Sequence, residues 1–179
     1  MTEFLFPDNT VLCNFAVVNR LDLLRLALGG CGRWTEAVAY EATRSASYVP
    51  ALNGLLADCW LGEAIEISSE PDTQKIERIR RGVFGGTDDQ PLKHLGEAQT
   101  CYVITNWIEL AGSWWISDDR ESLRYARAQR ITTRETADLV KIAVVNGDID
   151  ARDGLTLLRQ MVDLGRRLRL PNSVAALHR

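Results

Sequence analysis

The stretch from Phe4 to Ala16, FLFPDNTVLCNFA, decides the fold class. Its first four residues form a short apolar run that is typical of a buried β-strand, and Asp8 stands where that strand ends. Small polar residues follow, and the apolar pattern after them is helical. A strand that ends in a carboxylate and leads into a helix favours the first unit of a parallel α/β sheet.

The same arrangement recurs at Trp114–Asp119, WWISDD, another apolar run that ends in acid. If both runs are strands of one parallel sheet, their carboxyl ends meet at one edge, where open α/β sheets place their sites. Carboxylates at close range disfavour joint ionisation unless a cation lies between them. The two segments therefore predict a metal site.

The bulk composition is that of an ordinary folded domain. The chain has 179 residues, of which 46% are hydrophobic, enough for one domain with its own core. Its apolar runs are much shorter than the roughly 20 residues that cross a bilayer. The N-terminus lacks the basic segment and apolar core of a secretory signal. We therefore expect a cytoplasmic protein without membrane association.

Thiol and imidazole ligands are too scattered to predict a zinc site. The cysteines are far apart, with no C-x-x-C pair, and there are only two histidines. We expect Cys13, Cys31, Cys59 and Cys101 to be reduced core residues. A metal would then be held by oxygen ligands, which favours Mg²⁺ or Mn²⁺.

Charge is spread unevenly along the chain. Residues 1–117 carry 9 basic and 15 acidic side chains, whereas residues 118–179 carry 12 basic and 9 acidic ones. The C-terminal third is therefore the part expected to face a polyanion. A solvated helix face explains any single arginine there equally well. The candidates are Arg120, Arg124, Arg127, Arg130 and Arg134.

Strand-like and helix-like segments alternate along the chain, which predicts an α/β fold: a three-layer α/β/α sandwich with a small parallel sheet and a C-terminal helical extension. We expect the domain to span residues 1–132 and the extension, packed on it, residues 133–179. Glycine and acidic residues mark 85–91 as the best candidate for a mobile loop. The expected strands are 4–7, 31–34, 63–68, 113–117 and 131–132; the expected helices are 11–28, 35–42, 73–81, 95–110, 120–129, 133–145 and 150–168.

Two further acids lie among small or apolar neighbours in predicted helices. Glu41 follows VAY and Glu97 follows LG. Glu97 also falls in a first helical turn, where the macrodipole favours a negative charge by about 0.3–1 kcal/mol. That effect alone would explain Glu97 without a functional role.

Taken together, four segments resemble the PIN-domain nuclease family, in particular its branch of VapC-like toxins. The resemblance covers roughly residues 4–132, and the order and intervals of the segments carry it. They are Asp8–Leu12 (DNTVL), Glu36–Glu41 (EAVAYE), His94–Ala98 (HLGEA) and Ile116–Arg124 (ISDDRESLR).

The resemblance implies the roles of individual residues. Asp8, Glu41, Glu97 and Asp119 match the family's acidic quartet. Asp8, Glu97 and Asp119 would ligate metal. Asp118, next to Asp119, is a further candidate ligand. The Thr10 hydroxyl would support Asp8. Asn14 stands where many members carry Asp. Arg120 and Arg124 would contact RNA phosphates.

The function implied by the resemblance is a ribonuclease that depends on Mg²⁺ or Mn²⁺, very often the toxin of a toxin–antitoxin pair. Its partners would be RNA, possibly tRNA, a cognate antitoxin protein and a second copy of the chain. Residues 51–93 match no family motif and are a candidate specificity region.

Three other functions compete with this interpretation. A phosphatase with a strand-end Asp nucleophile needs a second Asp where Thr10 stands. A nucleic-acid-binding regulator could use the helical pair around residues 146–148, but its second helix begins with the acids Asp150 and Asp153, which would face phosphates poorly. A PIN-like scaffold without catalysis is also compatible with the sequence.

Overall fold

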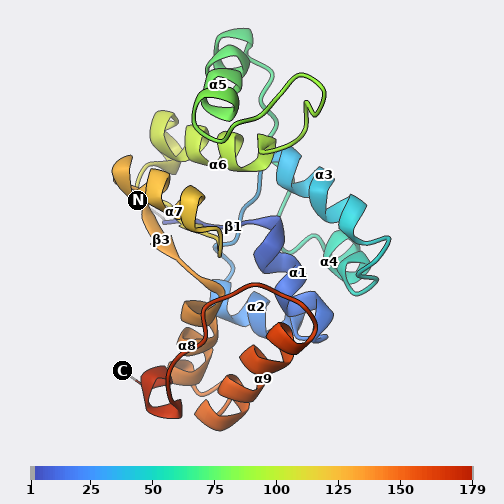
Figure 1. Cartoon of the computed structure of the whole chain (residues 1–179), viewed down its shortest axis with the longest axis vertical. Helices are drawn as coiled ribbons and strands as arrows, with labels where there is room; N and C mark the ends of the chain where they lie inside the picture. Colours follow the sequence, from blue (N-terminus) through green and yellow to red (C-terminus); the bar gives the residue numbers. More distant parts are fainter. Residues whose placement is uncertain (1–2, 179) are drawn as a thin grey trace.

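Three short parallel strands form the centre of the structure, a computed structural model that describes residues 3–178 (Figure 1). β1 (Leu5–Pro7) pairs with β2 (Trp114–Ile116), and β2 pairs with β3 (Thr132–Arg134). Isolated parallel bridges join Leu5 to Gly32 and Thr35 to Ile65 beyond β1. The predicted α/β fold with a small parallel sheet is confirmed.

The strands are shorter than the sequence pattern predicts. The expected strand 63–68 is reduced to the bridge at Ile65, and 31–34 to the bridge at Gly32. Alternation of polar and apolar residues records which side chains are buried, and it does not require a continuous ladder. The last strand lies at 132–134 rather than 131–132, so the expected domain boundary falls inside β3.

Helices account for most of the described chain. The predicted helical region 11–28, for which the sequence left open a break near Asn19 and Arg20, is two helices, because the chain turns at Asn19, which has a φ of 53°. The predicted helix 95–110 ends at Asn106, where Trp107 becomes extended. The helices are α1 (Asn9–Val17), α2 (Leu21–Leu28), α3 (Glu36–Ser45), α4 (Leu52–Asp58), α5 (Glu70–Gly82), α6 (Leu95–Asn106), α7 (Arg120–Ala128), α8 (Thr136–Asn146) and α9 (Ala151–Asp163), with the short 3₁₀ helices η1 (Ile108–Leu110) and η2 (Val174–Leu177).

Helices pack on both sides of the sheet because neighbouring strand residues point to opposite faces. Phe6 and Trp115 are buried with residues of α5, α6 and α7. Ile116 is buried in a second cluster with residues of α1 to α4, α8 and α9. The C-terminal helices therefore share a core with the N-terminal ones. Among the described residues, no helix is long and apolar enough to cross a membrane.

The cysteines only partly fit the expectation that they are core residues. All four are free thiols, and Cys13 and Cys101 are buried. Cys31 is half-buried, whereas Cys59 is exposed. Cys59 follows the end of α4 in a left-handed turn with a φ of 49°, which carries its side chain away from the core.

Candidate functional site: an acidic crevice at the strand ends

Asp8 is fixed at the carboxyl end of β1, beside the end of β2. Its backbone N–H donates to the carbonyl of Ile116 over 2.8 Å, and its side chain is buried. The carboxylate accepts hydrogen bonds from the backbone N–H of Asn9 at 2.8 Å, from the Ser117 hydroxyl at 3.3 Å and from the Thr10 hydroxyl. Asp8 thus caps α1 and has a single fixed orientation.

Glu41 and Glu97 meet where α3 packs against the start of α6. A Cβ atom on Gly96 would lie 3.1 Å from Oε1 of Glu41, so the glycine leaves the space that this carboxylate occupies. Glu97 is the next residue, and its Oε1 lies 3.1 Å from Nδ1 of His94. Glu97 therefore lies in the first turn of α6, and the Glu41 carboxylate of α3 lies against that turn, where the helix dipole favours negative charge.

Asp8, Glu41 and Glu97, here called the acidic trio, act on one another electrostatically. Burial, and then the charge of Glu97, raises the pKa of Asp8 to about 6. Burial, and then the charges of Asp8 and Glu97, raises the pKa of Glu41 to about 8. Three carboxylates from different parts of the chain therefore share one crevice in which their charges are poorly tolerated.

Asp118 belongs to a different set of contacts. Its carboxylate accepts hydrogen bonds from Nδ2 of Asn14 at 2.8 Å, from the Thr136 hydroxyl at 2.5 Å and from the Thr136 backbone N–H at 3.1 Å. Burial raises the pKa of Asp118, and the charges of Glu135 and Asp138 add to that rise, whereas the Thr136 bonds lower it. These contacts join the end of β2 to the start of α8.

Asp119 is exposed and caps the start of α7. It accepts hydrogen bonds from the backbone N–H and the hydroxyl of Ser122, at 2.9 and 2.6 Å. Burial raises the pKa of Asp119. The hydrogen bonds from Ser122 and the nearby charge of His94 lower it by a larger amount, so the net shift is downward.

Asp119 also borders the acidic trio. Its backbone N–H donates to the Ser117 hydroxyl at 3.2 Å, and this hydroxyl in turn donates to Asp8. His94, whose charge acts on Asp119, contacts Glu97. Of the two neighbouring aspartates, Asp119 therefore lies toward the trio and Asp118 toward the C-terminal helices.

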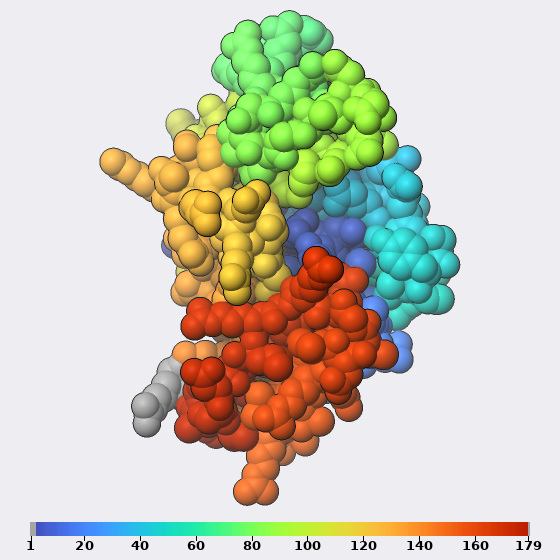
Figure 2. All heavy atoms as spheres, in the orientation of Figure 1, coloured from blue at the N-terminus to red at the C-terminus, as the bar shows by residue number. Residues whose placement is uncertain are grey.

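A groove of about 690 Å³ runs beside this crevice and carries four arginines. The acids Asp118, Asp119 and Glu135 and the hydroxyl-bearing Thr10 also line it. We call it the arginine groove after its four cations, which are Arg120, Arg166, Arg167 and Arg169. In Figure 2 the C-terminal segment (red) lies near α7 (yellow), and N-terminal residues (blue) are visible between them.

Arg166 is the best anchored of these arginines. Its Nε donates to Oδ1 of Asn14 at 2.7 Å, and its Nη2 donates to the carbonyl of Thr10 at 3.3 Å. Asn14, which the sequence marked as a position near the site, connects Arg166 to Asp118. The C-terminal segment is thus held against α1.

The arginines predicted from the sequence to face a polyanion have different surroundings in the structure. Arg120 lines the groove, and Arg124 is exposed one turn later on α7. Two others already have partners within the fold, because Nε of Arg127 donates to the Thr133 hydroxyl and the guanidinium of Arg134 lies 4.6 Å from the centre of the Trp114 ring. Part of the predicted polyanion surface is therefore structural.

Sequence reasoning missed Ser117, Thr136 and Arg166. Ser117 had a signal, since a small polar residue stands between a buried strand and an acidic pair. Arg166 had none, because 152 residues separate it from its partner Asn14. Thr136 resembles any helix-starting threonine in sequence.

The donor atoms of the trio are all carboxylate oxygens, which suits a hard divalent cation. Within residues 3–178, no group of three or more His, Cys, Asp or Glu side chains is placed to hold a metal ion as it stands. Comparisons with family models, with curated proteins and with solved structures find no match to this chain.

Proposed function

We propose that the chain is a divalent-metal-dependent endoribonuclease with its active site at the acidic trio. The observation that carries this proposal is the meeting of three acids from distant segments: the Glu41 carboxylate lies against Gly96 in the first turn of α6, Glu97 is the next residue, and the charges of Asp8 and Glu97 both act on Glu41. Bringing one buried and two half-buried acids together costs folding free energy unless a cation compensates them. Neutral side chains would fill a purely structural role at a smaller cost in folding free energy.

Asp8, Glu41 and Glu97 would hold Mg²⁺ or Mn²⁺, with Asp119 as the neighbouring carboxylate at the rim. An ion bound there supplies Lewis-acid stabilisation of a phosphate and lowers the pKa of a bound water. Asp118 is the weaker candidate ligand, because its carboxylate lies against Asn14 and Thr136, and the charges that raise its pKa are those of Glu135 and Asp138 rather than those of the trio.

The chain's own residues would divide the remaining work. Thr10 and Ser117 hold the Asp8 carboxylate in one orientation through their hydroxyls. Glu41, whose pKa burial and its acidic neighbours raise to about 8 in the metal-free protein, would release its proton when the cation binds. Arg120 and Arg166 would bind substrate phosphates through charge-assisted hydrogen bonds.

The arginine groove supports a nucleic-acid substrate rather than a small acid. It begins at Thr10 and Asp119, beside the trio, and continues along residues 166–169. A chain of phosphates could therefore pass from the acids into a basic groove, which suits a polyanion and gives salt-dependent binding.

The biological setting is proposed from the resemblance to PIN domains. The four acidic segments resemble those of the toxin branch, so we propose a toxin that cleaves RNA, with tRNA as a candidate substrate, and is blocked by a cognate antitoxin protein. A homodimer is proposed on the same basis. Growth arrest on expression, relieved by a small neighbouring protein, would test this setting.

The proposal is tested by cleavage of an RNA with both stems and unpaired loops in Mn²⁺ or Mg²⁺. We expect cleavage by the wild type, its loss in EDTA, and losses of more than about 100-fold in Asp8→Asn and Glu97→Gln, beyond the range for outer-shell partners of metal ligands. An exposed acid far from the trio, changed in Asp148→Asn, is the matched control.

Equal activity in wild type, Asp8→Asn and Glu97→Gln would contradict the proposal. Absence of cleavage by folded wild type in both metals would favour a PIN-like scaffold without catalysis. The regulator alternative has less support, because α9 turns Leu155, Leu158 and Met161 into the core.

A further inference from the structure

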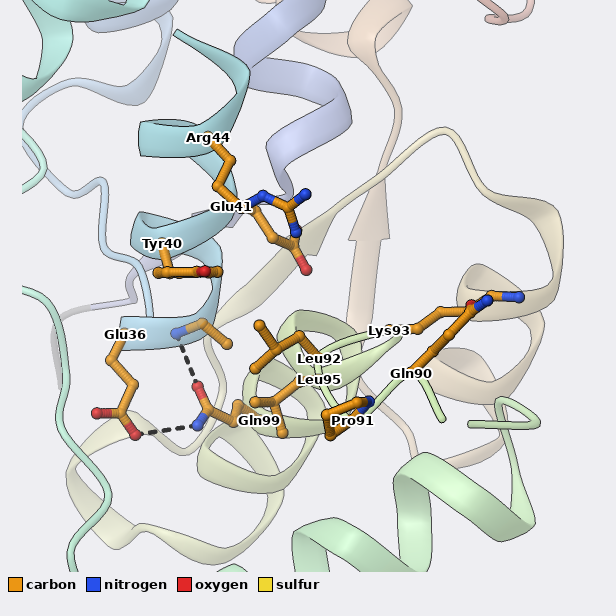
Figure 3. Close-up of a pocket in the computed structure, with 11 residues that line it drawn as sticks. Glu36, Tyr40, Glu41, Arg44, Gln90, Pro91, Leu92, Lys93, Leu95 and Gln99 are labelled. Carbon is orange, nitrogen blue, oxygen red and sulfur yellow. Dashed lines mark hydrogen bonds between the residues drawn. The ribbon is translucent and has the colours of Figure 1, made fainter. Parts of the chain in front are cut away.

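A second groove, of about 760 Å³, opens beside the acidic trio and shares Glu41 with it. It lies between α3 and the loop that precedes α6. Figure 3 shows Tyr40, Glu41 and Arg44 on α3, with Leu92 on the opposite side. We call it the α3 groove. If a phosphate of the substrate lies at the trio, the part of the substrate next to that phosphate would lie in this groove.

The loop wall of the α3 groove is held by a buried arginine. Arg80 of α5 is 1% exposed, and two of its nitrogens donate to the Glu77 carboxylate at 2.7 Å. The same guanidinium donates to the carbonyls of Thr87 at 3.2 Å, Gln90 at 3.2 Å and Lys93 at 3.3 Å. Two carbonyls of the segment 85–91, expected to be mobile, and the carbonyl of Lys93 just after it are thus fixed, which pre-forms the groove.

The floor of the groove is also fixed. Oε1 of Gln99 accepts from the backbone N–H of Ala37 at 3.1 Å, and Nε2 of Gln99 donates to Glu36 at 3.0 Å (Figure 3). These polar groups already satisfy one another. Recognition by the groove therefore falls to the side chains of its walls.

Those walls combine an exposed aromatic ring with two cations. The Tyr40 side chain is 49% exposed and Leu92 is 43% exposed, so a flat apolar ligand would cover both. Arg44 and Lys93 also line the groove and bring positive charge to it. A planar base attached to phosphates matches this set, because bases stack on aromatic rings while cations bind the backbone.

We propose that the α3 groove binds an unpaired nucleobase of the RNA, stacked on Tyr40, next to the phosphodiester at the acidic trio. The substrate class is therefore single-stranded RNA, since a base inside a duplex is not free to stack on a protein ring. The inference rests on the proposed function, because it places the phosphodiester at Asp8, Glu41 and Glu97.

Binding of a fluorescently labelled, unstructured RNA of about 12 nucleotides tests the inference. Anisotropy is measured in the Asp8→Asn background without divalent cations, so that no cleavage occurs. We expect Tyr40→Ala to weaken binding about 5- to 20-fold, in the lower range for base–aromatic stacking. Tyr40→Phe keeps the ring and should stay within about 2-fold. Ile108→Ala, an 85% exposed residue beyond the far end of α6, is the matched control.

A duplex of the same sequence completes the experiment. We expect it to bind more weakly than the single strand and to be indifferent to Tyr40→Ala. No binding of the single strand, equal binding by Tyr40→Ala, or an equal loss for single strand and duplex would each overturn the inference. Equal binding would assign the groove to another occupant, such as a protein segment.

The inference and the proposed function can fail separately. Wild-type cleavage that needs Asp8, together with RNA binding that ignores Tyr40, would overturn only the base site. RNA binding that needs Tyr40, in a protein that cleaves no RNA with Mn²⁺, would overturn only the nuclease.

Discussion

Asp8 and Asp118 both follow a parallel strand, Asp8 directly and Asp118 one residue later, yet their surroundings differ. Asp8 faces Glu97 and Glu41, whose charges oppose its own. Asp118 faces the amide of Asn14 and two donors of Thr136. Both carboxylates accept three hydrogen bonds, but the acids that act on Asp8 belong to the trio, whereas those that act on Asp118 are Glu135 and Asp138 at the start of α8.

The difference separates a candidate catalytic acid from a structural one. Hydrogen bonds to Asp118 join β2 to α1 and α8 and, through Asn14, to Arg166. The carboxylates around Asp8 come from α3 and α6, and the negative charges of the three acids repel one another. Removing the charge of Asp118 should therefore destabilise the fold, whereas removing a charge from the trio should reduce the repulsion between its carboxylates.

The largest effect on stability is expected from Asp118→Ala. It removes three hydrogen bonds and leaves donors of Asn14 and Thr136 without their acceptor, so the free energy of unfolding should fall by about 2–4 kcal/mol. Urea denaturation measures this loss. Asp8→Asn, which keeps a side chain able to cap α1, is the matched comparison and should change little. Unchanged stability in Asp118→Ala, with cleavage abolished, would move Asp118 to the metal site.

A pH-dependent effect is expected from Glu41→Gln. The folded-state pKa of Glu41, raised to about 8 from an ordinary value of 4.5, means that the folded protein retains a proton which the unfolded chain releases. The Glu41 contribution to stability is therefore full below pH 4.5 and is lost as the pH rises toward 8.

Thermal unfolding in EDTA measures this dependence. At pH 8.5 the Glu41→Gln variant should be more stable than the wild type by on the order of 1–3 kcal/mol, and the difference should vanish near pH 4. The exposed Glu66→Gln serves as the control. A wild type that gains stability from pH 5 to 8.5 relative to Glu41→Gln would reverse the sign and refute the assignment.

The smallest effect is expected from Gly96→Ala. A Cβ there would lie 3.1 Å from both Oε1 of Glu41 and Cγ2 of Val38, which offsets the gain of about 0.5–1 kcal/mol from replacing a helical glycine. Net stability should change by less than about 1 kcal/mol, while Mn²⁺ affinity falls severalfold. Gly82→Ala, with no atom within 4 Å of the new Cβ, reports the helical gain alone. Unchanged Mn²⁺ affinity in Gly96→Ala would separate Glu41 from the metal.

The sequence predicted the small parallel sheet because the sheet depends on local patterns, whereas the grouping of Asp8 with Glu41 and Glu97 was implied only by the resemblance of four segments to PIN domains. Apolar runs that end in acid mark strand ends, and an acid among small residues marks a close helix contact. The strand expected at 63–68 failed because its alternation reflects burial rather than pairing.

The rest of the site depends on long-range contacts that leave no local pattern. Nothing near Arg166 indicates that it binds Asn14, and nothing near Arg80 indicates that it fixes the loop of the α3 groove. The choice between Asp118 and Asp119 was likewise open, because their different hydrogen-bond partners come from α8 and α7.

Calorimetric titration of Mn²⁺ into the metal-free protein at pH 7 tests most directly whether the acidic trio is a cation site. The account predicts binding by the wild type with release of a proton, because metal displaces the proton held by Glu41, and affinity weakened by more than about 100-fold in Asp8→Asn. Titration in two buffers of different ionisation enthalpy measures the proton. No Mn²⁺ binding by the wild type, or equal affinity in Asp8→Asn, would contradict it.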